Sequence, residues 1–195
     1  MKTLIVYTHP RPTSFNHAIY QTAKAALEDA GHDVRVRDLY SLKFKVTSDD
    51  EDLTRLESEN IPDDIRTEQE HIAWVDLLVF VHPVWWQDRP ALLKGWLDRV
   101  FSDGFAYEIE ESGPNGLLGG KKAVVFQTTD GLLEQDCATD GAKDVIGRSM
   151  RDGTLNFCAV EVLTYKTFYA VRTVPQEARE AMLEEVTNVI AGLQL

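Results

Sequence analysis

The sequence is short of several features that would point to particular classes of protein. Its 195 residues include only two cysteines, Cys137 and Cys158, with no C-x-x-C pair, and five histidines without the spacing of zinc ligands. The cysteine spacing leaves a disulfide open, but two free thiols in a reducing cytoplasm are the favoured interpretation. No run of 18 apolar residues occurs. We therefore expect no metal site and no membrane insertion.

Positive charge is also scarce. Twenty Lys and Arg residues stand against 32 Asp and Glu residues, which leaves a formal net charge of −12. Such a surface repels phosphodiester backbones, so we do not expect nucleic-acid binding. An anionic ligand would need a local field from helix N-termini or from a few placed cations. The apolar run within Met1–Tyr7 is too short for a signal peptide, which predicts a cytoplasmic protein.

Three familiar motifs are missing. No G-x-G-x-x-G follows the first expected strand, so a Rossmann dinucleotide site is not expected. There is no G-x-S-x-G nucleophile elbow. The segment 116–122 faintly resembles a P-loop, but Asn115 stands where its first glycine should be, and the segment precedes a strand instead of following one.

Apolar periodicity is what the chain does have, and it alternates between strand and helix. Strands are predicted at Leu4–Thr8, Asp33–Leu39, Leu77–Val81, Ala123–Gln127 and Asn156–Val162. Helices are predicted at Phe15–Ala30, Ile65–Trp74, Pro90–Phe101, Asp140–Met150 and Pro175–Leu193. Asp49–Glu59 is expected to be a surface loop with a helical turn, and Glu110–Lys122 a polar, glycine-rich excursion. This pattern predicts one α/β domain over residues 1–195, with a parallel sheet covered on both faces.

Loops after the first, third and fourth strands would open on one edge of such a sheet. The first, His9–Asn16, places Ser14 and Asn16 at a helix start, where unpaired N–H groups can cradle a phosphate. Ser14 would equally serve as a plain N-cap. His9 is either a phosphate donor or an ordinary loop histidine.

The second loop, Pro83–Gln87, carries the adjacent tryptophans Trp85 and Trp86. These rings either pack in the core or flank a planar ligand. The third loop, Thr128–Gly131, has two hydroxyls and a glycine that would let its backbone approach a ligand, although a simple turn explains it as well.

Four blocks of sequence carry a resemblance to a known family. They are His9-Pro10 with Ser14-Phe15-Asn16, the stretch Asp64–Phe101, Phe105-Ala106-Tyr107, and Thr128-Thr129 with Gly153–Cys158. On these blocks the chain resembles the flavodoxin-like NAD(P)H:quinone oxidoreductases. That group includes mammalian quinone reductases, bacterial modulators of drug activity and ancillary subunits of glutathione-gated potassium efflux systems.

The resemblance implies a flavodoxin-like fold with sheet order 2-1-3-4-5, a homodimer, and ping-pong hydride transfer from NAD(P)H through FMN or FAD to a quinone. FMN is the slightly favoured cofactor. By the same resemblance the phosphate side would be held by His9, Ser14, Phe15 and Asn16. The isoalloxazine would be lined by Pro83, Val84, Trp85, Trp86 and Gln87. Thr128, Thr129, Asp130 and Gly131 would face its pyrimidine end, where backbone N–H groups would stabilise negative charge. Tyr107 is the expected catalytic residue of the substrate pocket.

Two departures from the family pattern stand in the third loop. Asp130 occupies a position that mammalian members fill with glycine, and a carboxylate there would disfavour an anionic reduced flavin unless it points to solvent. The tyrosine and histidine expected shortly afterwards are missing from Leu132–Gly141. Reduction of azo or nitro compounds at the same site, a regulatory subunit of a potassium efflux transporter, and a one-electron carrier remain alternative functions.

Overall fold

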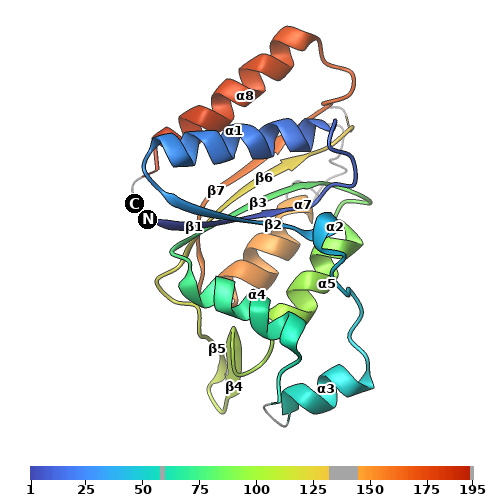
Figure 1. Ribbon diagram of the computed structural model, residues 1–195, viewed down its shortest axis with the longest axis vertical. Helices are drawn as coiled ribbons and strands as arrows, with labels where there is room; N and C mark the ends of the chain where they lie inside the picture. Colours follow the sequence, from blue (N-terminus) through green and yellow to red (C-terminus); the bar gives the residue numbers. More distant parts are fainter. Residues whose placement is uncertain (58–59, 132–144, 194–195) are drawn as a thin grey trace.

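A five-stranded parallel sheet separates two layers of helices in the computed structural model, which describes residues 1–57, 60–131 and 145–193 (Figure 1). The sheet order is β2-β1-β3-β6-β7, which confirms the predicted order 2-1-3-4-5. The strands are β1 (Lys2–Tyr7), β2 (Asp33–Asp38), β3 (Leu77–Pro83), β6 (Lys122–Thr128) and β7 (Glu161–Phe168). The helices are α1 (Phe15–Asp29), α2 (Leu39–Leu42), α3 (Asp50–Glu57), α4 (Asp63–Trp74), α5 (Ala91–Val100), α7 (Val145–Met150), the π-helix η1 (Arg151–Asn156) and α8 (Gln176–Ala191).

The central strands are apolar throughout because each of their faces is covered. In β1, Ile5 and Tyr7 pack beneath α1 and α8, whereas Leu4 and Val6 pack against the layer formed by α4, α5 and α7. The same alternation divides β3 between the two cores, and all seven of its residues are buried. Two separate hydrophobic cores therefore hold the sheet, and its edge at the strand carboxyl ends is left to the loops.

The acidic segment after α2 is more ordered than predicted. Asp50–Glu57 forms the two-turn helix α3, so the expectation of a surface loop with one helical turn is wrong. The buried guanidinium of Arg99 on α5 holds it by bonding to the carboxylates of Asp52 and Asp64. Gly95, one turn earlier on α5, leaves room for the chain at Val46. The pair Arg99–Asp52, 47 residues apart in the sequence, fixes this segment. A local sequence pattern cannot predict such a long-range ion pair.

The fifth strand was predicted at Asn156–Val162, and this is wrong. Strand β7 begins at Glu161, while the residues before it form η1 and a turn. Leu155, Cys158 and Val160 are buried all the same, because η1 and the turn fold them into the core. A short apolar run has the same composition whether a strand or a helical turn buries it, which explains the error.

The glycine-rich excursion contains a hairpin that lies apart from the main sheet. Strands β4 (Tyr107–Glu110) and β5 (Gly113–Gly116) pair antiparallel and project beyond the layer of α4 and α5 (Figure 1). No helix within the described ranges has the length and apolarity to cross a membrane.

Candidate active site

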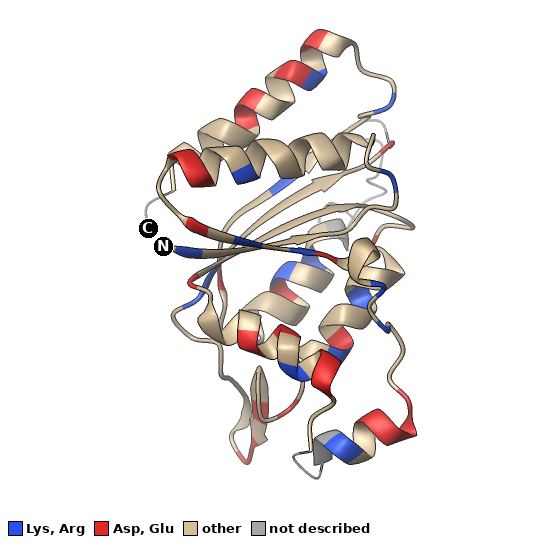
Figure 2. Ribbon diagram, viewed as in Figure 1, with Lys and Arg blue, Asp and Glu red and all other residues tan. Residues whose placement is uncertain are grey.

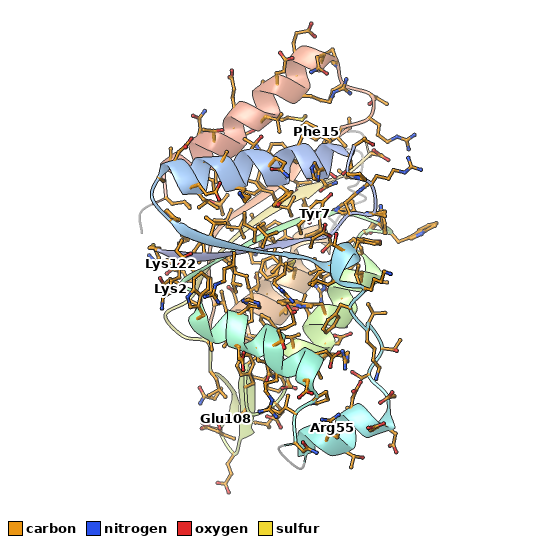
Figure 3. The ribbon with its side chains drawn as sticks, in the orientation of Figure 1. Lys2, Tyr7, Phe15, Arg55, Glu108 and Lys122 are labelled. Atoms are coloured by element: carbon orange, nitrogen blue, oxygen red, sulfur yellow. The ribbon has the colours of Figure 1, made fainter. Side chains whose placement is uncertain are left out.

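A cavity of about 930 Å³ opens where the strands of the sheet end. Its walls come from the loops that follow β1, β3, β6 and β7 and from the first turn of α1. Figure 3 shows Phe15 and Tyr7 at this end of the sheet, and Lys2 and Lys122 at the opposite end. The lining residues are His9, Pro10, Arg11, Thr13, Ser14, Phe15, Asn16, Ala18, Pro83, Val84, Trp85, Thr128, Thr129, Asp130, Gly131, Val171, Arg172 and Arg179.

The start of α1 presents polar groups to this cavity. The Ser14 hydroxyl caps the helix by accepting the His17 N–H at 3.1 Å. Asn16 is buried, and its amide donates to the Thr128 hydroxyl at 2.7 Å. The side-chain amide oxygen of Asn16 has no partner among the described residues. Buried polar atoms without partners indicate a place where a polar ligand belongs.

His9 joins the first loop to the aromatic loop. Its Nδ1 accepts the Arg11 N–H at 3.1 Å, and its ring centre lies 6.4 Å from that of Trp85. Partial burial lowers the pKa of His9, so the ring is neutral near pH 7 and offers one N–H donor to a ligand.

The aromatic loop is a tight turn in an unusual conformation. The Trp85 N–H donates to the Asp88 carbonyl at 2.8 Å and the Asp88 N–H donates back at 3.1 Å. Between them Trp86 and Gln87 have φ values of 53° and 61°, in the left-handed region that non-glycine residues rarely adopt. Trp85 is 43% exposed and lines the cavity, whereas Trp86 is fully exposed and, like Gln87, lines no part of it.

The loop after β6 is tied to the loop after β7. The Thr129 N–H donates to Phe168 O at 2.9 Å, and the Gly131 N–H donates to the Thr129 hydroxyl at 3.0 Å. These two N–H groups are thus already engaged, and the Asp130 N–H is without a partner in the described parts of the chain. Of the backbone N–H groups expected to stabilise a developing negative charge, that of Asp130 is therefore available to a ligand.

Three lining residues near this loop were missed by the sequence reasoning. Val171 and Arg172 follow β7, and Arg179 lies on α8 and donates to Val171 O at 3.4 Å. Because the fifth strand was predicted to end at Val162 and ends at Phe168, the loop that follows it was not recognised as a fourth wall of the cavity. Figure 2 shows basic residues in the β1–α1 and β7–α8 loops at the same end of the sheet. This cationic rim is the local counter-field that an anionic ligand needs in so acidic a chain.

Tyr107 does not reach this cavity. It starts β4 and packs edge-on against Phe157, with ring centres 5.2 Å apart. Figure 3 shows its neighbour Glu108 on the projecting hairpin, well away from Phe15. Burial raises the pKa of Tyr107, so its phenol stays protonated at neutral pH. Within one chain, then, this residue cannot serve the cavity.

Some sequence predictions fall outside the described residues. The segment without the tyrosine and histidine, Leu132–Gly141, lies there, as do Cys137 and the first half of the helix predicted at Asp140–Met150. Cys158 is a buried free thiol whose pKa burial raises to about 11.

Comparison with known proteins agrees with the geometry. A family model described as the flavodoxin-like fold matches residues 1–190. Human ribosyldihydronicotinamide dehydrogenase [quinone] is 33% identical over 201 residues, covering 93% of this chain and 87% of that protein. The chain belongs to the flavodoxin-like NAD(P)H:quinone oxidoreductase family. The resemblance drawn from its sequence blocks is confirmed.

Two solved structures are similar to this chain over nearly its whole length. An NAD(P)H:quinone oxidoreductase from Methanothermobacter marburgensis has a TM-score of 0.85 and 29% identity, covering 100% of this chain and 98% of that one. General stress protein 14 of Treponema denticola, solved in complex with FMN, has a TM-score of 0.68 and 25% identity, covering 98% and 96%.

Proposed function

We propose that this protein is a flavin-dependent NAD(P)H:quinone oxidoreductase. The observation that carries the proposal is the cavity at the strand carboxyl ends, which joins a capped helix N-terminus and three arginines to an aromatic turn. One elongated ligand with an anionic end and a flat aromatic end matches that arrangement. The names of its relatives supply the substrate class, a quinone.

The anionic end would lie at α1. This helix is 15 residues long, so its unpaired N–H groups carry the full partial positive charge of a helix start. Ser14, Phe15 and Asn16 form the first turn, with Arg11 and His9 beside them. We expect FMN in preference to FAD, in keeping with the FMN complex of a structural neighbour.

The flat end would lie between the loops after β3 and β6. Pro83, Val84 and Trp85 give one wall, and Thr129 and Asp130 the other. When bound, a flavin would supply the hydride-transfer chemistry that links NAD(P)H to the acceptor. The chain supplies orientation, exclusion of water by the Trp85 ring, and the Asp130 N–H where negative charge develops. Because both substrates would use one exposed face, ping-pong kinetics are expected.

The remaining predicted residues belong to the proposed homodimer. Trp86 is fully exposed at the tip of its turn, and Phe157, the ring partner of Tyr107, is 38% exposed. We infer that a second copy covers these rings and brings Tyr107 to the neighbouring cavity as a wall for the acceptor. Light scattering should return twice the 22.0 kDa of one chain.

The test is the cofactor itself. The purified protein should be yellow, should be bleached by NAD(P)H without oxygen, and should regain its colour with menadione. The mass of the extracted flavin decides between FMN and FAD. A colourless protein that cannot be reconstituted with either flavin rejects the proposal.

The same titration addresses the alternatives. Stable one-electron reduction during the titration would indicate a flavodoxin-like carrier in place of a two-electron enzyme. Azo and nitro compounds belong in the acceptor panel. Co-purification with a potassium efflux transporter would indicate the regulatory role.

A further inference from the structure

The turn Trp85–Asp88 requires a source of rigidity that its own residues do not supply. A left-handed conformation is unfavourable for a non-glycine residue, and here two such residues are adjacent. The Trp86 ring is fully exposed, so packing against the described residues does not fix it. A conformation of this kind persists only where the surrounding structure over-determines it.

Arg89, the residue that follows the turn, is buried in an uncommon way. Its side chain is only 4% exposed, although it is charged. The one carboxylate within ion-pair distance in the described residues is Asp88, at 3.7 Å, and that side chain is 45% exposed. The guanidinium Nε has no partner among the described residues. Burying a charge with so weak a counter-ion is unfavourable, so stability does not explain this placement.

The contacts of Arg89 reach the π-helix. Nη1 donates to the Ser149 hydroxyl at 3.0 Å, and Nη2 donates to the Thr154 hydroxyl at 3.3 Å. Thr154 in turn donates to the Ser149 carbonyl at 3.0 Å, across the widened turn where α7 passes into η1. One side chain thus bridges the end of the aromatic turn and the helix that leads to Phe157.

The near end of Arg89 is fixed as well. Its N–H donates to the Asp88 carboxylate at 2.7 Å, and Pro90, the N-cap of α5, follows at once. His82, which is fully buried and precedes the turn, donates its Nδ1–H to Pro83 O at 3.0 Å. Hydrogen bonds therefore fix the chain on both sides of the turn.

We propose that Arg89 is a positioning residue for the proposed reaction: by bridging Ser149 and Thr154 it holds Trp85 and Trp86 in their left-handed turn. The kinetic consequence rests on the proposed function, but the conformational one does not. Without the bridge the two tryptophans would sample other conformations, while the sheet and both cores stay unchanged.

The experiment compares Arg89→Met with Arg148→Met, an exposed arginine on α7 next to Ser149. Methionine fills the buried volume without charge, so unfolding should change little. The chain has four tryptophans, Trp74, Trp85, Trp86 and Trp96, so ¹⁹F NMR of 5-fluorotryptophan-labelled protein resolves them after assignment with single Trp→Phe variants. In Arg89→Met the Trp85 and Trp86 signals should shift or broaden, and those of Trp74 and Trp96 should not.

Stopped-flow measurement of the two half-reactions gives the second readout. Reduction by NADPH and reoxidation by menadione should each slow at least about tenfold in Arg89→Met, because small misplacements at a reacting centre are costly. Cofactor affinity should stay within about threefold, since Arg89 does not line the cavity and the N-terminus of α1 keeps its unpaired N–H groups. Arg148→Met should match the wild type in every measurement.

Unchanged Trp85 and Trp86 signals would overturn the inference, as would unchanged half-reactions in a variant that binds flavin. If Arg89→Met fails to fold, the variant Ser149→Ala/Thr154→Val removes both acceptors and answers the same question. If the wild type binds no flavin, the proposed function is rejected, while the ¹⁹F signals still decide the role of Arg89.

Discussion

The Asp130 carboxylate and the Arg172 guanidinium lie 3.4 Å apart, Oδ2 to Nη1, and join the loops after β6 and β7. The sequence suggested that Asp130 would repel a reduced, anionic flavin unless it pointed to solvent. Its side chain is 57% exposed, as that condition requires, and a cation faces it as well, so the conflict is relieved. The unusual carboxylate of Asp130 is thus paired with Arg172, and the two residues come together only in the folded chain.

Removing that cation should weaken binding of the anionic cofactor. Exposed ion pairs are worth at most about 1 kcal/mol, so we expect the Kd of the flavin to rise about two- to fivefold in Arg172→Gln at low salt. The effect should fade at high salt. Asp130→Asn/Arg172→Gln should recover most of the loss, measured by flavin fluorescence quenching. A double variant as weak as Arg172→Gln would contradict the pairing.

Trp86→Ala should separate function from stability. Because this ring is fully exposed, the free energy of unfolding should change by less than about 0.5 kcal/mol. Quinone reduction and dimer formation should both fall. The buried Trp96, whose indole donates to Glu68 at 3.0 Å, is the contrast: Trp96→Ala should cost about 3–5 kcal/mol in urea unfolding. If Trp86→Ala remains dimeric and fully active, the Trp86 ring has no role in the active site.

Asn16→Ala should affect the cavity and the fold together. It deletes the 2.7 Å hydrogen bond to Thr128 and the free carbonyl that we assign to the ligand. Loss of one such buried interaction costs about 1–3 kcal/mol, so the Kd of the flavin should rise roughly tenfold or more. Asn188→Ala, at an exposed position of α8, is the control. Equal effects from both variants would show that the loss is not specific.

Acid should weaken the attachment of α3. Burial acts to raise the pKa of Asp52, but hydrogen bonds from Arg99 and Lys45 outweigh it and lower the pKa to about 2. The stabilisation is therefore complete above the ordinary value of 3.8 and is lost as the pH falls towards 2. Asp52→Asn should cost roughly 1.5–3 kcal/mol at pH 7, and this difference should shrink towards pH 2 in urea titrations. The control is Asp50→Asn at an exposed position of the same helix, which should leave the free energy of unfolding at pH 7 nearly unchanged.

Gly95→Ala tests the close approach of the preceding segment to α5. An added Cβ would lie 2.1 Å from the Val46 carbonyl oxygen, so backbone must move, at a cost of at least about 1–3 kcal/mol. In Gly119→Ala the added Cβ meets nothing within 4 Å, and its thermal midpoint should match the wild type. If both variants melt together, the segment does not pack on α5 as described.

Much of the site could be predicted because it depends on local pattern. The continuous apolar runs of β1 and β3 required cover on both faces, and parallel strands bring the loops behind them to one edge. Ser14 and Asn16 at a helix start, and the Thr128–Gly131 loop, followed from that rule alone. Eleven of the predicted residues line the cavity: His9, Ser14, Phe15, Asn16, Pro83, Val84, Trp85, Thr128, Thr129, Asp130 and Gly131.

What could not be predicted depends on contacts between distant residues. Leu155 and Cys158 read as part of a strand because burial by a π-helix leaves the same apolar signature, and that error concealed Arg172. The left-handed turn at Trp86 and Gln87 contains no glycine, so the sequence gives no signal of its conformation.

The amino-acid sequence by itself determined the alternation of strands and helices, the family, and the edge of the sheet at which the candidate site lies, because these follow from periodicity and from short motifs. The tertiary structure alone decided which charges meet. Arg172 beside Asp130, Arg89 beneath the tryptophan turn and Arg99 behind α3 are each placed by the register of packed elements. Electrostatic interactions depend on distance in space, and distance along the chain does not report it.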